Sequence, residues 1–309
     1  MIRLVRAEFR RLLARRLFRI IALLAAIGLA GGGVLAFATS HSLSETTYQQ
    51  RVKEAEAKRI AQRNNVEACL RQHGYDENSS DRVPESIAQA CFPKQPITAH
   101  DPRFHRTRLK GILQGLSGVL CIVGWVIGAS FVGAEFASRS MTTLLTWEAR
   151  RGRVFLAKLI AVTTTVAAFA AIVLLVAMAV MLPSMVMHGG PLRPTEPHWP
   201  GLFGILGRGT LLAALGAGIG FAIATIGRNT AAALGAGFAY ILILENILGS
   251  SLVRWRRWLL LGNVIVLVSG KASSDVPGRS VTGAGLFLAA VTATFAIAAA
   301  SAFRVRDIA

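Results

Sequence analysis

The chain has 309 residues, of which 53% are hydrophobic and only 16% charged, a balance that argues against an ordinary soluble domain. Its formal net charge is +18, from 34 Lys and Arg against 16 Asp and Glu. In a soluble protein this charge would favour a nucleic-acid partner, but apolar runs of nearly bilayer length separate the basic residues here. We therefore expect an all-α polytopic membrane protein that does not bind nucleic acid.

The first 19 residues form a basic segment in which Ile2, Val5, Phe9 and Leu12 follow helical spacing. We predict an interfacial elbow helix over residues 1–19 that lies along the inner leaflet. Its lipid-phosphate contacts would come from Arg3, Arg6, Arg10, Arg11 and Arg15. Two alternatives stay open: a topology signal without fixed structure, and a signal peptide cleaved after the sequence Ala36-Phe37-Ala38.

Six apolar stretches are long enough to cross a hydrocarbon core of about 30 Å as helices. In chain order these predicted spans are 20–38, 111–134, 159–182, 209–226, 230–253 and 281–303. The connections are 39–110, 183–208 and 254–280 on the outer side and 135–158 on the inner side. An even number of spans puts both termini, including the tail 304–309, on one side, which the terminal arginines make cytoplasmic. The apolar segment Trp258 to Ser269 is too short to cross and predicts a re-entrant piece before the sixth span.

The longest connection, residues 39–110, is expected to form a small helical cap outside the membrane. A charged amphipathic helix is predicted from Leu43 to Leu70, and prolines make the rest irregular. Cys69 and Cys91 lie in this loop, whereas Cys121 lies in the second span. A disulfide between the outer pair would stabilise the loop by about 3 kcal/mol on the chain-entropy model. Two free thiols are the alternative.

Motifs for catalysis are missing from the sequence, which has no HExxH, CxxC, GxSxG or GxxxxGK[ST]. We expect no catalytic residues, no metal and no cofactor bound by this chain. His100 and His105 could hold a metal ion, but no cysteine or carboxylate pattern accompanies them. An integral-membrane transferase is disfavoured because the predicted spans hold no cluster of acids and histidines.

Glycine is abundant in the predicted spans. Gly216 and Gly220 share one helix face, and Gly235 and Gly237 follow in the next span. Such spacing permits close backbone approach between helices. A dinucleotide-binding fingerprint is disfavoured, because neither run has the full GxGxxG spacing and no strand precedes either run.

Glu245 is the one plainly intramembrane acid in the sequence. A buried acid in a span suggests a pathway residue, and with Tyr240 and Asn246 it forms the candidate translocation path. The alternative is that Glu245 faces water of the outer leaflet or pairs with Arg254 or Arg257.

The strongest local pattern is the sequence GAEFASRSMTTLLTWEARRGR, which runs from Gly133 to Arg153 and is followed by Lys158. Together with RNTAAALG at the start of the fifth span and LENIL near its end, it resembles the ABC type-2 transporter permeases. The elbow helix and the short apolar segment before the last span extend the resemblance over essentially the whole chain. The family often has glycine where Ser140 stands and proline where Ala149 stands.

The resemblance implies that residues 135–158 contain a cytoplasmic coupling helix that docks into a groove on a separate ABC ATPase subunit. The coupling residues would be Glu135, Arg139, Leu144, Leu145, Trp147, Arg150, Arg151 and Arg153. A solvated basic loop that only fixes topology would explain the arginines but not the apolar residues beside them. The family also implies two permease and two ATPase chains, a homodimer of this chain being expected, with ATP and Mg²⁺ on the ATPase.

The sequence thus predicts the permease subunit of an ATP-driven ABC exporter in the cytoplasmic membrane, in contact with membrane lipids and without enzymatic activity of its own. Its substrate would be a drug, antibiotic, peptide or lipid-like molecule. The alternative is a membrane anchor or sensor subunit whose outer cap binds a ligand or accessory protein.

Overall fold

The computed structural model describes residues 2–75, 84–92, 101–138, 140–141, 150–190, 196–245, 247, 253–272, 276 and 278–305. These residues form helices and no β-strand, apart from one isolated bridge between Phe104 and Gly189. They divide into two compact units. The bundle unit comprises Met1–Leu35, His105–Leu182 and Leu192–Ala309, and the α3 unit comprises Ala36–Phe104 and Pro183–Pro191.

Five helices among the described residues are long and apolar enough to cross a membrane. They are α2 (Arg16–Thr39), α5 (Arg106–Ala137), α7 (Arg151–His188), α8 (Trp199–Gly227) and α12 (Val281–Val305). Each extends beyond the apolar stretch predicted for it, because helix geometry continues through the flanking polar residues once the hydrocarbon core has been crossed. The helical membrane fold is confirmed, whereas the count of six spans stays a prediction.

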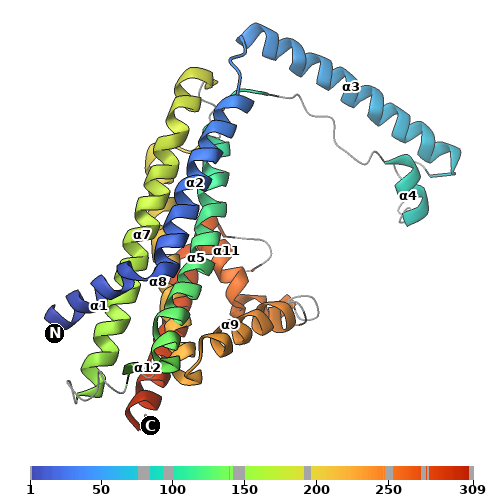
Figure 1. The fold of residues 1–309 in the computed structure, drawn as a ribbon. Helices are drawn as coiled ribbons and strands as arrows, with labels where there is room; N and C mark the ends of the chain where they lie inside the picture. Colours follow the sequence, from blue (N-terminus) through green and yellow to red (C-terminus); the bar gives the residue numbers. More distant parts are fainter. Residues whose placement is uncertain are drawn as a thin grey trace. The chain divides into compact units, whose positions relative to one another are not determined.

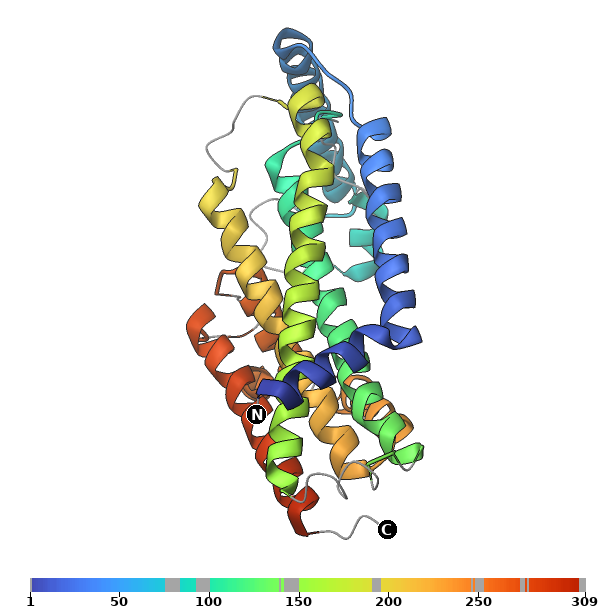
Figure 2. The same ribbon diagram turned by 60° about the vertical axis from the view of Figure 1, so that its left-hand side comes forward.

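Among the long helices of the bundle unit, α2 and α7 run in one direction and α5, α8 and α12 run in the opposite direction (Figures 1 and 2). α2 runs alongside α7 in the same direction, with the rings of Phe18 and Phe169 5.4 Å apart. α12 runs opposite to α7, and the ring of Phe155 near the start of α7 lies 6.0 Å from that of Phe303 near the end of α12. α5 and α8 run parallel and pack closely, because a Cβ at Gly220 would overlap the backbone of α5.

The region predicted as the fifth span is not one continuous helix in the described residues. α9 (Thr230–Ala239) has 10 residues and passes into a π-helical segment η1 (Tyr240–Glu245) of 6 residues. Sixteen residues at 1.5 Å each span about 24 Å, less than a hydrocarbon core of about 30 Å. A 3₁₀ segment η2 (Val253–Trp258) and the short helix α11 (Leu260–Ser269) follow.

These short segments connect the end of α8 to the start of α12 and run back along the bundle. The start of α9 abuts Gly133 near the end of α5, since a Cβ there would overlap Thr230. The end of α11 lies near the first half of α5, where Gln114 Nε2 donates to the carbonyl of Ser269 at 3.2 Å. α11 therefore packs against α8 and α12 of the bundle. The re-entrant placement of Trp258 to Ser269 stays a prediction.

The predicted elbow helix is shorter than expected. α1 (Ile2–Ala14) ends before Arg15, and α2 begins at Arg16. The face of α1 that packs on the bundle holds Glu8 and Leu12, both 1% exposed, whereas Phe9 and Leu13 are exposed. The predicted apolar stripe is therefore divided between the bundle and the outside.

The α3 unit is built around α3 (Glu45–Gln72), which begins where Ser44 Oγ accepts a hydrogen bond from Thr47 N. A second, short helix α4 (Glu85–Cys91) follows Pro84, in a region that the prolines predicted to be irregular. Pro84 permits it because proline is tolerated at the start of a helix, where a backbone N–H has no helical acceptor. A disulfide joins Cys69 of α3 to Cys91 of α4.

Arg103 organises the other end of the α3 unit. Its side chain is buried and donates to both carboxylate oxygens of Asp101, at 2.9 and 3.0 Å, and to Glu45 at 2.7 Å. Its guanidinium also lies over the ring of Tyr48, 4.3 Å from the centroid. The hydrogen bond to Asp101 raises the pKa of Arg103 above its usual value, so this cation stays charged throughout the physiological pH range.

Candidate functional site

A buried ionic cluster joins three elements of the bundle unit at the start of α7. Lys158 Nζ lies 2.8 Å from Glu8 Oε2 of α1 and 2.7 Å from Glu135 Oε2 of α5. The side chains of Lys158 and Glu8 are each 1% exposed, and that of Glu135 is 9% exposed. Such charges are tolerated in a protein interior only when paired. The cluster therefore fixes α1, α5 and α7 to one another.

Two arginines complete the cluster at its rim. Arg15 Nη2 lies 3.1 Å from Glu135 Oε1 and its Nη1 donates to the carbonyl of Ser130 at 3.1 Å. Arg11 pairs with Glu8 at 3.1 Å. Burial lowers the pKa of Arg15, whereas the nearby carboxylate of Glu135 raises it. The pKa of a guanidinium lies so far above neutral pH that Arg15 stays protonated. Two carboxylates thus face three cations, and no carboxylate is left without a counter-charge.

Local sequence explains how this cluster forms. Glu135 lies in the last turn of α5, where the helix dipole disfavours a negative charge, so a nearby ammonium group offsets both the dipole and the burial. The ring of Phe131, one turn earlier, lies beneath both Arg15 and Lys158, 4.8 and 5.2 Å from its centroid. Face-on contact of this kind is favourable for both cations. Figure 2 shows α1 crossing α7.

The predicted coupling segment is only partly described. Arg139 and residues 142–149, which include Leu144, Leu145 and Trp147, lie outside the described residues. Docking of this segment therefore stays a prediction. What the structure adds is that its two ends, Glu135 and Lys158, meet in the buried cluster.

The three remaining coupling arginines lie at the start of α7. Arg150 and Arg153 are exposed, as a docking surface requires. Arg151 donates to the carbonyl of Arg304 in α12 at 3.4 Å, so this residue also joins the two helices.

Sequence reasoning missed Glu8, although it is the only acid in an arginine-rich helix. It also assigned Arg15 to lipid phosphates, whereas the structure turns Arg15 towards Glu135. Arg3, Arg6 and Arg10 are exposed, and for them lipid contact stays a prediction. Arg11 is also exposed, but it pairs with the buried carboxylate of Glu8.

The predicted translocation residues lie at the start of α11. Glu245 is 9% exposed, and its Oε1 accepts a hydrogen bond from Leu261 N at 2.7 Å. Tyr240 Oη accepts one from Leu260 N at 3.2 Å. The residue before α11, Leu259, has no side-chain acceptor, so these two side chains satisfy amides that would otherwise lack partners. Asn246 lies outside the described residues.

Comparison with protein families gives one match over nearly the whole chain. Residues 2–300 match the model of the ABC-2 family transporter protein. Comparison with curated individual proteins gives no match. The family model covers the buried cluster, the partly described segment between α5 and α7, and the segments that lead back from α8 to α12.

Proposed function

Because this chain belongs to the ABC-2 transporter family and is therefore a transmembrane permease component of an ABC transporter, we propose that it works as an exporter. Permeases of this kind work with an ABC ATPase partner. We place ATP and Mg²⁺ on that partner, with two ATPase chains serving a homodimer of this chain. The substrate class is a drug, antibiotic, peptide or lipid-like molecule, and both termini face the cytoplasm of the cell that holds the protein in its inner membrane.

The observation that supports coupling of this chain to an ATPase partner is the buried cluster at the two ends of the segment 135–158. A force on the segment 135–158 acts first on the end of α5 and the start of α7. Those two points are joined through Glu135 and Lys158, and Glu8 adds α1. Separating a buried ion pair leaves an uncompensated charge at a cost of about 3–5 kcal/mol. The three elements should therefore move as one body when the ATPase changes its state.

The cluster can be tested with Lys158 variants in proteoliposomes that also contain the ATPase partner. Lys158→Met leaves two buried carboxylates without their central cation, and we expect it to lower both the melting temperature and the transport per ATP hydrolysed. Lys158→Arg keeps the charge and should retain more of both. Lys110→Met, which removes a lysine near the start of α5, serves as the matched control.

The same assay can distinguish a loss of coupling from a failure to fold. Because Lys158→Met could prevent folding, the triple variant Glu8→Gln, Lys158→Met, Glu135→Gln removes all the central charges together. Only the rim cations Arg11 and Arg15, whose side chains are 55% and 25% exposed, then stay charged. This variant should fold but loosen the connection between α1 and α7, so transport per ATP should stay low. Wild-type transport by this triple variant would contradict a role of the cluster in coupling.

A second candidate function is a membrane anchor or sensor, and one observation favours it. α3 has 28 residues and contains no buried residue, as expected for a helix that meets solvent or a partner on every side. In this case the chain would bind its ligand without moving it. Substrate transport by the reconstituted permease and ATPase alone would exclude this candidate as the main function.

A further inference from the structure

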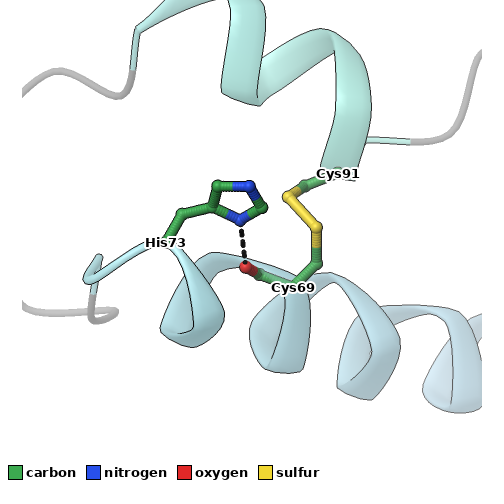
Figure 3. The surroundings of a disulfide bond; sticks show 3 residues. All are labelled: Cys69, His73 and Cys91. Carbon is green, nitrogen blue, oxygen red and sulfur yellow. Dashed lines mark hydrogen bonds between the residues drawn. A yellow bond between two sulfur atoms is a disulfide. The ribbon is translucent and has the colours of Figure 1, made fainter.

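A cluster of potential metal ligands lies in the α3 unit, away from the coupling region. Cys69 and His73 are four residues apart and therefore share one face at the end of α3, and Cys91 ends α4. The ligand atoms of the three residues all lie within 4.8 Å of one another. Figure 3 shows the imidazole of His73 beside the disulfide that joins the two cysteines.

The hydrogen bond of His73 fixes which ring nitrogen is free. Nδ1 lies 2.9 Å from the carbonyl oxygen of Cys69, and a carbonyl can only accept, so Nδ1 carries the hydrogen. In the neutral imidazole the lone pair is then on Nε2. A histidine that ligates a metal typically holds its other nitrogen in this way, through a backbone carbonyl.

The backbone of this corner is also ordered around the ligands. His73 caps α3, and its N–H donates to the carbonyls of Cys69 and Leu70 at 3.3 and 3.0 Å. His73 is exposed, so ions can reach it, while Cys91 is 9% exposed. Two sulfurs and one imidazole form a donor set suited to zinc, with a fourth position for water.

We propose that reduction of the Cys69–Cys91 disulfide converts this corner into a zinc site with Cys69, Cys91 and His73 as ligands. A thiol reductant supplies two electrons and two protons, the S–S bond breaks, and the reductant leaves as its own disulfide. Zn²⁺ then displaces the two thiol protons and forms bonds to both thiolates and to Nε2 of His73. Zn–S bonds of about 2.3 Å in tetrahedral geometry place the sulfurs about 3.8 Å apart, so α3 and α4 separate only slightly.

The two states are mutually exclusive, and each links α3 to α4. In the oxidised state the link is covalent and the sulfurs are unavailable to metal. In the reduced state the link exists only when zinc is bound. The α3 unit would therefore respond to the redox state and to zinc together, and this property does not depend on what the permease transports.

The test uses the purified full chain without an affinity tag, in detergent. The disulfide is reduced with a phosphine, which is then removed under inert gas, and Zn²⁺ is titrated in competition with a chromophoric chelator. We expect one zinc per chain in the reduced protein and none in the oxidised protein. Co²⁺ added in place of zinc should give the sulfur-to-cobalt charge-transfer bands of a tetrahedral thiolate site.

Three variants define the ligand set. Cys69→Ser with Cys91→Ser should abolish binding in both redox states. His73→Ala should weaken binding to the reduced protein by about tenfold or more, because losing a ligand costs at least as much as losing a second-shell partner. His41→Ala, an exposed histidine of the same unit, should bind zinc as the wild type does. The proposal fails if the reduced wild type binds no more zinc than the double serine variant, or if His73→Ala leaves affinity and cobalt spectrum unchanged.

Discussion

Glu245 caps the start of α11, a role that its position in the sequence does not indicate. In lipid every backbone amide needs a partner within the protein, because no water is present to replace it. The amides of Leu260 and Leu261 at the start of α11 find theirs in Tyr240 and Glu245. The carboxylate also lies at the start of α11, where the first backbone amides have no acceptor within the helix. Capping thus accounts for a buried acid whether or not it also lines a path.

The capping role predicts different effects for two substitutions of Glu245. Glu245→Leu removes the acceptor and should lower the free energy of unfolding by about 1–2 kcal/mol, the usual effect of losing a helix cap. Glu245→Gln keeps an oxygen acceptor and should change stability much less. Thermal denaturation of the purified chain measures both, and equal stability of wild type and Glu245→Leu would contradict the capping role.

Transport assays on the same Glu245→Gln variant then address the path. If the charge of Glu245 acts on substrate, this variant should alter transport or substrate-stimulated ATPase activity while its melting temperature stays near that of the wild type. Tyr240→Phe removes the neighbouring acceptor but no charge, so it separates an effect of capping from an effect of charge. An effect of Glu245→Gln on stability alone would count against a path role.

Sequence alone identified Glu245 as unusual but could not identify its partner. The amide of Leu261 lies 16 residues further along the chain, and only the packing of α11 against α8 and α12 brings the two together. Glu8 was missed for the same reason, because Lys158 is 150 residues away. Hydropathy detects a charge in an apolar setting, but partners distant in the sequence are set by tertiary packing.

At the scale of elements, the closest packing in the bundle is between α5 and α8. Both helices carry glycines four residues apart: Gly124 and Gly128 on α5, Gly216 and Gly220 on α8. A Cβ at any of the four would overlap a carbonyl oxygen of the opposite helix. The predicted close approach of Gly216 and Gly220 is therefore observed, and its partner face on α5 is an addition from the structure.

This packing predicts that replacing these glycines by alanine lowers the stability of the bundle. Gly128→Ala and Gly220→Ala should each destabilise the bundle by about 1–3 kcal/mol, because the added methyl group meets backbone that cannot move aside. Gly118 lies on the same helix as Gly128, but a Cβ at Gly118 would meet nothing within 4 Å. Gly118→Ala should therefore be neutral or slightly stabilising. Melting temperatures that do not separate these variants would contradict the close packing.

Hydropathy predicted the helices with long apolar runs, but it did not predict where a helix changes type. The five long helices follow from hydropathy, since about 20 apolar residues must form a helix to satisfy their backbone in lipid. The run 230–253 is equally apolar, but the structure bends it through the π-helical segment Tyr240–Glu245. Such a segment depends on contacts made by individual side chains, which an average over a window does not contain.

At the scale of the whole chain, both terminal helices meet the start of α7. Glu8 of α1 binds Lys158, and Arg304 of α12 accepts from Arg151. The two ends of the bundle unit's sequence therefore lie on one side of the bundle, together with the ends of the coupling segment. This arrangement agrees with an even number of crossings. It places charged terminal helices around the site at which the ATPase is proposed to act.

The coupling proposal makes its last prediction for Trp147, whose position lies outside the described residues. Trp147→Asp places an unpaired charge in the proposed docking groove, where its desolvation costs several kcal/mol. We expect transport per ATP hydrolysed to fall on the order of tenfold, as a loss of about 1.4 kcal/mol in coupling would produce. Trp147→Phe, which keeps an apolar ring, should retain most of the transport.

Stability separates this variant from those of the buried cluster. If Trp147 docks to the ATPase, Trp147→Asp leaves the interior of the permease unchanged, so the melting temperature of the isolated permease should stay within a few degrees of the wild type, as for most surface substitutions. Lys158→Met alters the interior of the same region and should lower it. Two variants that both impair transport, of which only one impairs stability, would assign Trp147 to docking and Lys158 to transmission. A Trp147→Asp protein that assembles with the ATPase and transports normally would show that the ATPase docks elsewhere.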